Sequence, residues 1–141
     1  MTQLVPGETT ATHNDDVVVL VVPADGSYLA VLRTATAGLA ARLQFTLDEI
    51  EDLRIAVDEA CAMLLAVAPG SAELTCEFEV TPAALSIEVA VPVRGTAALP
   101  GSQSFSWQVL TALAGEVAAE TSADRAAIRL TKRRAPQRAG S

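Results

Sequence analysis

The sequence is poor in the residues that mark nucleic-acid-binding proteins, metalloproteins and disulfide-stabilised secreted domains. Ten Lys and Arg stand against seventeen Asp and Glu, and a chain with this net charge of −7 is repelled by phosphate backbones. It has one histidine, His13, and two cysteines, Cys61 and Cys76, which lie in apolar or alternating stretches. Buried, reduced thiols are therefore favoured over a disulfide or a metal site.

Long apolar runs and aromatic residues are also scarce. No run approaches the length that spans a bilayer, and the first residues lack the basic and apolar regions of a secretory signal, so we expect a cytoplasmic protein without a membrane partner. Aromatics make up 4% of the chain, while half of its 141 residues are apolar. One domain with a core of Ala, Val, Leu and Ile is expected.

Hydrophobic periodicity and Gly or Pro breakers divide the chain into an arm, one domain and a tail. We expect a flexible arm over 1–14, a domain over 15–132 and a basic, flexible tail over 133–141. Period-two patterns predict strands, and i, i+3, i+4 patterns predict helices. The expected order is a strand at 17–22, helices at 27–44 and 46–68, strands at 73–80 and 85–91, a helix at 105–114, and strands at 117–120 and 126–131.

Grouped helices, rather than one after each strand, predict an α+β fold. We expect a two-layer sandwich with a mixed, mostly antiparallel sheet and about three helices on one face. Residues 17–22 are apolar without interruption, which is typical of a strand covered on both faces. One cover would be the chain's own helices, and the other would be the second subunit of a homodimer.

Glu59 is the first candidate for chemistry. It lies where the second helix changes from a polar half to the all-apolar run 60–68. A partly desolvated carboxylate there would suit a general base. The alternative is a carboxylate that is solvated or paired, and most helical glutamates are of that kind.

The stretch 53–61, Leu-Arg-Ile-Ala-Val-Asp-Glu-Ala-Cys, resembles the N-box helix of the GHKL ATPases, the superfamily of gyrase-type, histidine-kinase and chaperone ATPases. It is most similar to the anti-sigma-factor serine kinases of stress and sporulation control. Residues 116–117 and 128–132 resemble the closing strands of that family, and 104–113 resembles the last helix of its actinobacterial members. The resemblance covers about 17–132 and implies a Bergerat-type fold.

The resemblance implies catalytic and nucleotide-binding roles that only some residues match. In catalytic members the N-box Glu, here Glu59, activates a hydroxyl or water, and an Asn four residues later binds Mg²⁺. Met63 stands at that position, and a thioether does not replace an amide oxygen for this cation. The resemblance therefore implies no metal ligand here.

The nucleotide-binding segments of the family also differ in this chain. The adenine-reading Asp-x-Gly-x-Gly run corresponds to Val-Pro-Val-Arg-Gly at 91–95, and the lid at 99–105 keeps only Gly101. The Gly-Thr pair before the last strand corresponds to Arg-Ala-Ala at 125–127. Because phosphate loops need glycine for close backbone approach, the site is degenerate by this comparison. Glu59, Gly95 and Gly101 remain as nucleotide contacts.

Three further residues are candidates for protein contacts. In the family, the region of Tyr28 and Arg33 helps to hold the sigma factor, although a solvated arginine is the plainer interpretation of Arg33. Trp107 suits an interface, but a tryptophan on a helix stripe is more often a core residue.

The first functional hypothesis is an anti-sigma factor in stress-response transcription. It would sequester an RNA polymerase sigma factor, which an anti-anti-sigma (STAS-domain) protein would release. Its ATP binding would be weak or absent, and no cofactor is expected. The second is an ATP-dependent serine kinase that phosphorylates the anti-anti-sigma protein. A third is a protein that shares the fold and regulates something else, because fold alone does not fix function.

Overall fold

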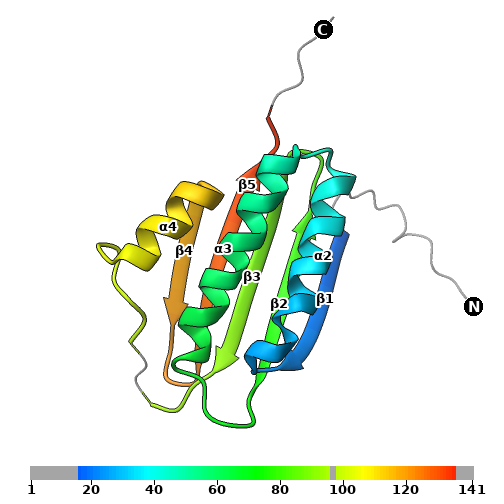
Figure 1. Ribbon diagram of the computed structural model, residues 1–141. Coiled ribbons are helices and arrows are strands. Elements are labelled where there is room, and N and C mark those ends of the chain that lie inside the picture. Colours follow the sequence, from blue (N-terminus) through cyan, green and yellow to red (C-terminus); the bar gives the residue numbers. More distant parts are fainter. Residues whose placement is uncertain (1–15, 96–97, 136–141) are drawn as a thin grey trace, which may run out of the picture.

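The computed structural model describes residues 16–95 and 98–135. It is an α+β structure with one five-stranded sheet and three α-helices on one face of it (Figure 1). The predicted arm, 1–14, lies outside the described residues. In chain order the elements are β1 (Asp16–Pro23), a 3-10 turn η1 (Gly26–Tyr28), α2 (Leu29–Arg42), α3 (Leu47–Leu65), β2 (Glu73–Val80), β3 (Ala84–Pro92), α4 (Phe105–Ala114), β4 (Glu116–Thr121) and β5 (Arg125–Arg133).

The strand order is β1-β2-β3-β5-β4, and all four pairings are antiparallel. The prediction of a mixed sheet is wrong in this respect. The α2–α3 hairpin returns the chain so that β2 runs antiparallel to β1. After α4, β4 runs in the direction of β3, but β5 lies between these two strands and pairs antiparallel with both.

Local signals in the sequence fix the ends of the helices. Thr46 and Glu49 form a capping box at the start of α3: the Glu49 N–H donates to Thr46 Oγ1 at 3.1 Å, and the Thr46 N–H donates to the Glu49 carboxylate at 2.8 Å. Ser104 caps α4 through the Trp107 N–H, at 3.1 Å. Gly115, at φ +96°, ends α4 in a conformation that suits glycine.

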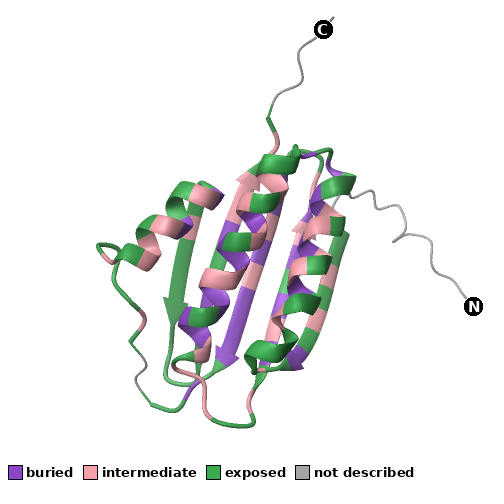
Figure 2. Cartoon of the chain, in the orientation of Figure 1, coloured by how far each residue is buried: buried purple, intermediate pink, exposed green. Residues whose placement is uncertain are grey.

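The core lies between α3, the central helix, and the middle strands (Figure 2). The alternating strand residues that face the helices are almost fully buried: Leu74, Cys76, Phe78, Leu85, Ile87, Val89, Ile128 and Leu130. Cys61 and Cys76 are unpaired thiols with no exposed surface. Burial raises the pKa of Cys61 to about 12, with a smaller contribution from Asp58, and raises that of Cys76.

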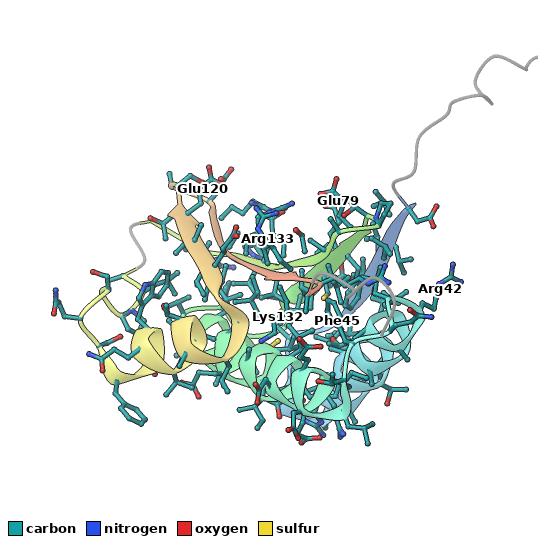
Figure 3. The ribbon with its side chains drawn as sticks, turned by 90° about the horizontal axis from the view of Figure 1, so that it is seen from above. Arg42, Phe45, Glu79, Glu120, Lys132 and Arg133 are labelled. Carbon is teal, nitrogen blue, oxygen red and sulfur yellow. The ribbon has the colours of Figure 1, made fainter. Side chains whose placement is uncertain are left out.

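The outer face of the sheet is charged at its centre. Arg129 pairs with Glu79 at 2.9 Å, and Arg133 pairs with Glu116 at 2.6 Å. Figure 3 shows Glu79 and Arg133 on the side of the sheet away from the helices. This agrees with the prediction that the β2–β3 hairpin is solvated on one side.

β1 is an edge strand, and its outer face is bare within the chain, with Val17, Val19 and Val21 between 53% and 54% exposed. That a second subunit covers this face stays a prediction. Ala62, in the last turn of α3, and Ala66, just after the helix, are exposed.

The ordered domain also continues past the predicted boundary at Lys132. β5 includes Arg133, and the Arg134 N–H donates to the Ala83 carbonyl at 2.7 Å. The reason is that Arg133 pairs with Ala84, so the strand lasts as long as its partner β3 does. The remainder of the predicted tail, 136–141, lies outside the described residues.

A membrane-crossing helix is not found in the described part of the chain, since none of its helices combines the necessary length with the necessary apolar character.

Candidate functional site

Glu59 lies on α3 and is half-buried, between half-buried Asp58 and fully buried Ala60. Within residues 16–95 and 98–135, no hydrogen bond or ion pair reaches its carboxylate. The structure therefore places Glu59 at the polar–apolar junction that the sequence indicates. A carboxylate in this state can accept a proton or receive a positive group from another molecule.

Met63 lies one turn further along α3 and is only 5% exposed. It belongs to the hydrophobic core cluster, together with Val91, Val93 and Ala126. Its thioether is a soft, weak acceptor, whereas Mg²⁺ is held by oxygen ligands. The position next along the helix face from Glu59 is thus occupied by a packing residue.

The end of β3 and the start of β5 are equally apolar. Val91 is 1% exposed, Val93 is 5% exposed and Ala126 has no exposed surface. The Val93 N–H donates to the Asp124 carbonyl at 3.1 Å, so the backbone donor at this strand end is already used. The resemblance aligns the end of β3 with the run that carries the adenine-reading Asp, and it aligns the start of β5 with the Gly-Thr pair.

The two glycines predicted to contact a nucleotide lie in the loop after β3. Gly95 has a φ of +70° and Gly101 starts the approach to α4, where its carbonyl accepts a hydrogen bond from the Ser104 N–H at 2.9 Å. Both glycines are exposed, and a Cβ added at either would meet no atom within 4 Å. Among the described residues no hydrogen bond joins either glycine to Glu59.

A surface hollow that the sequence did not indicate lies beside this loop. Its volume is about 410 Å³, and its lining includes Leu99, Pro100, Ser102, Trp107 and Thr121. Trp107 is half-buried and packs against the core cluster, which agrees with its interpretation as a packing residue, but it also forms a wall of this hollow. The loop residues carry no periodic pattern, so Trp107 was the only residue in the lining whose type could have indicated a binding surface.

Arg33 is not a free, solvated arginine. Its guanidinium donates to the Asp58 carboxylate at 2.9 Å and joins α2 to α3 beside Glu59. Its side chain is 34% exposed and that of Asp58 is 41% exposed, so both can also be reached from solvent. Tyr28, at the start of α2, is 42% exposed. The partner contact expected of Tyr28 and Arg33 stays a prediction.

The outer side of α3 carries three carboxylates for which the described residues supply no partner: Asp48, Asp52 and Glu59. Spacings of four and seven residues place them along one side of the helix. Ile55, 44% exposed, lies between Asp52 and Glu59 on the same side. This row is an acidic, partly apolar surface that is open to another molecule. We call it the α3 row.

The described residues contain no group of three or more His, Cys, Asp or Glu side chains arranged to hold a metal ion. The acids of the α3 row lie along the helix rather than around one point. They therefore suit contact with another molecule's surface rather than coordination of a metal ion.

Comparison with known proteins gives short but strong matches. No family model matches the chain. It is 47% identical over 49 residues to the serine-protein kinase RsbW of Bacillus subtilis, a match that covers 35% of this chain and 31% of that protein. RsbW of Halalkalibacterium halodurans is 43% identical over 49 residues, covering 35% and 30%. RsbW of Bacillus velezensis is 44% identical over 46 residues, covering 33% and 29%.

The chain is a partial homologue of serine-protein kinases named RsbW. The matched part spans about a third of the length of these curated relatives.

Proposed function

We propose that this protein is an anti-sigma factor that sequesters an RNA polymerase sigma factor without relying on bound Mg–ATP. It would release the sigma factor to an anti-anti-sigma protein of the STAS-domain type. The observation that carries the proposal is the burial of Met63, Val91 and Ala126 in the core, where the resembling ATPases place polar or glycine residues. The scaffold supports a regulator of this family, while the interior no longer supplies the groups that a nucleotide needs.

The residues at these positions do not fit Mg–ATP. A side chain that binds Mg²⁺ must offer oxygen, and one that reads adenine must offer a hydrogen-bonding group. Met63 and Val91 offer neither, and Val91 is 1% exposed, so a purine edge could not reach it without opening the core. This supports partner binding through the surface.

The α3 row supports contact with a basic segment of the sigma factor. Its three carboxylates are free to pair, and Ile55 offers an apolar contact in their midst. The Arg33–Asp58 ion pair joins α2 to α3, which pack against each other, so Tyr28 at the start of α2 and the α3 row lie on neighbouring helices. Opposite charge of this kind speeds association and selects the partner, whereas buried contacts supply most of the affinity.

The experiment is co-purification of the tagged chain from its native cells with mass spectrometry, followed by titration of the sigma factors recovered. Asp52→Lys should raise the Kd at least about tenfold, because one attraction is exchanged for a repulsion. The matched control is Glu120→Lys, which makes the same change in charge on the exposed strand β4. A failure to form any sigma complex at micromolar concentrations, or an equal effect of the control, would contradict the proposal.

Release is tested by adding a STAS-domain protein to the purified complex. The proposal expects free sigma factor to appear in the absence of nucleotide. A complex that dissociates only when Mg–ATP is present would argue against a nucleotide-independent regulator.

The second candidate function is a serine kinase that phosphorylates the anti-anti-sigma protein. It is favoured by the unpartnered, half-buried carboxylate of Glu59 and by the similarity to proteins named serine-protein kinase. Glu59 would be the general base. Phosphoryl transfer to a STAS-domain protein that Glu59→Gln abolishes would establish this alternative, and no transfer by the unaltered chain would reject it.

We also propose that the protein acts as a homodimer. The support is the uncovered outer face of β1, whose three valines are more than half exposed. A lone strand edge of this composition is a template for pairing with another chain.

A further inference from the structure

The strand β4 forms the edge of the sheet opposite β1, and it is exposed along most of its length (Figure 2). Among its six residues only Val117 is half-buried. β5 is the only described strand that pairs with it, so one side of the β4 backbone points away from the sheet. An extended segment of another protein can add a strand to a free edge of this kind, with main-chain hydrogen bonds for affinity and side-chain contacts for specificity.

On the helix face, β4 forms one wall of the hollow of about 410 Å³ beside Trp107. Ala119 and Thr121 are the β4 residues of this wall, and both are exposed. Leu99 and Pro100 contribute apolar surface from the loop before α4. A strand added to β4 would place a side chain beside Ala119 at a Cβ separation of about 5 Å. A large apolar side chain at that position would cover the exposed part of Trp107.

On the outer face, β4 carries two glutamates with an alanine between them. Figure 3 shows Glu120 on the side of the sheet away from the helices, and Glu116 and Ala118 share this side by strand alternation. A second hollow, of about 310 Å³, has a lining that includes Glu116 and Ala118 together with Arg129 and Thr131 of β5. β4 is therefore flanked by a hollow on each face.

The glutamates dominate the charge beside Ala118. Arg129 is the neighbour of Ala118 on β5, but its guanidinium is turned to two glutamates of β2 and β3, away from β4. Glu120 has no hydrogen bond or ion pair within residues 16–95 and 98–135. Glu116 contacts Arg133, and both side chains are more than half exposed. A basic residue that faces Ala118 would thus have a carboxylate diagonally on either side, within reach of a long side chain.

We propose that β4 binds an extended segment of a partner protein, in which a basic residue is flanked by large apolar residues. The segment adds a sixth strand to the sheet. Its basic residue faces Ala118 and pairs with Glu120 and Glu116, while an apolar neighbour enters the hollow beside Trp107. This interaction goes beyond the proposed function, because it uses the edge of the sheet and leaves the α3 row free.

Charge favours a separate protein as the occupant over a second copy of the chain. β4 contains two acidic residues and no basic one. Two copies joined through β4 would therefore bring like charges together, which destabilises a strand pair. A partner segment with Lys or Arg replaces this repulsion with attraction, and the net charge of −7 on the chain steers such a segment toward it.

The test uses the fluorescence of Trp107, which is the only tryptophan in the chain and so reports directly on the hollow. The probe is the synthetic peptide acetyl-Thr-Leu-Lys-Leu-Thr-amide. Its leucines flank the lysine, so a leucine reaches the helix face in either strand direction. Titrated into the full chain, the peptide should shift the Trp107 emission to the blue until it saturates, because leucine replaces water at the ring.

A charge exchange tests the role of the glutamates. The matched peptide with Glu in place of Lys should bind at least about tenfold more weakly, because an attraction becomes a repulsion. Glu120→Lys should weaken the lysine peptide and strengthen the glutamate peptide, a reversal that a loss of folding does not produce. Glu77→Lys is the control, since it makes the same change on the same face of the sheet but on β2, and it should leave the Kd unchanged.

The absence of a saturable shift at millimolar peptide would overturn the proposal, as would equal binding of the two peptides or a Kd that Glu120→Lys does not alter. Sedimentation of the same samples gives a further check. If the peptide dissociated the proposed homodimer, it would be acting at the β1 edge and the assignment to β4 would be wrong. No sigma factor or nucleotide is present in these measurements, so their failure is separate from a failure of the proposed function.

Discussion

Apolar side chains are buried in the interior beside α3, whereas they are exposed at the edge strand β1. Met63, Val91 and Ala126 are buried where the resembling ATPases use polar groups and glycine. Val17 and Val19 are exposed where the edge of an isolated sheet would be charged. The interior beside α3 is thus packed as core, whereas the outer face of β1 leaves its valines exposed.

The core is continuous from α3 across β3 and β5, and Met63, Val91 and Ala126 are part of it. The comparison teaches that the side chains at these positions contribute to packing. In the proposed function, binding uses side chains that are exposed, namely those of the α3 row and of the β1 edge.

The largest expected effect comes from Val91→Asp, which places an acid at the position that the resemblance aligns with the adenine-reading Asp. Because Val91 is 1% exposed among core residues, an aspartate there is an unpaired buried charge. It should lower the free energy of unfolding by about 3–5 kcal/mol, or prevent folding. Urea denaturation measures the change.

Arg94→Asp is the matched control, because Arg94 is exposed in the same segment. It should shift stability by less than about 0.5 kcal/mol. If Val91→Asp were tolerated as well as the control, the interior would hold a polar cavity after all, and the comparison would fail.

A second, intermediate effect concerns the buried thiols at alkaline pH. The unfolded chain loses its thiol protons above a pKa near 9, whereas burial raises the folded-state pKa of Cys61 to about 12 and also raises that of Cys76. The folded state then holds more protons than the unfolded state, so stability falls as pH rises above 9. The expected slope is about 1.4 kcal/mol per pH unit for each thiol.

Denaturation midpoints measured from pH 8 upward check this prediction. Cys61→Ala should remove about half of the alkaline slope, and the double variant with Cys76→Ala should remove nearly all that the thiols contribute. A slope unchanged in the double variant would show that other groups cause the alkaline loss.

The smallest expected effect is a gain in stability from a substitution in α2. Gly38 lies within α2, and a Cβ added there would meet no atom within 4 Å. Gly38→Ala should stabilise the fold by about 0.5–1 kcal/mol, because glycine is a poor helix former. Gly95→Ala, at a φ of +70°, should have the opposite sign. Thermal unfolding distinguishes them, and a loss at Gly38 would point to a contact not seen within the chain.

Much of the fold could be predicted because its signals are local. The α4 helix runs from Phe105 to Ala114 as predicted, since the Ser104 cap and Gly115 mark both ends. The β2–β3 hairpin follows from strict alternation. Strand order could not be predicted, because the pairing of β3 with β5 joins residues about 40 positions apart and has no local signal.

The candidate site was predictable in its residues but not in its contacts. The junction position of Glu59 is visible in the sequence as the change from polar to apolar composition. The Arg33–Asp58 pair is not, because it joins residues 25 positions apart through the packing of two helices. The exposure of Ala62 and Ala66 also has no signal in the sequence, since alanine suits both the buried and the solvent side of a helix.

The central claim is that the interior which resembles an ATPase site no longer binds nucleotide. Calorimetric titration of Mg–ATP into the unaltered full chain tests it most directly. We predict no saturable heat at ATP concentrations up to the millimolar range. Saturable binding at micromolar ATP, lost in a variant of the segment 91–95 that remains folded, would contradict the account.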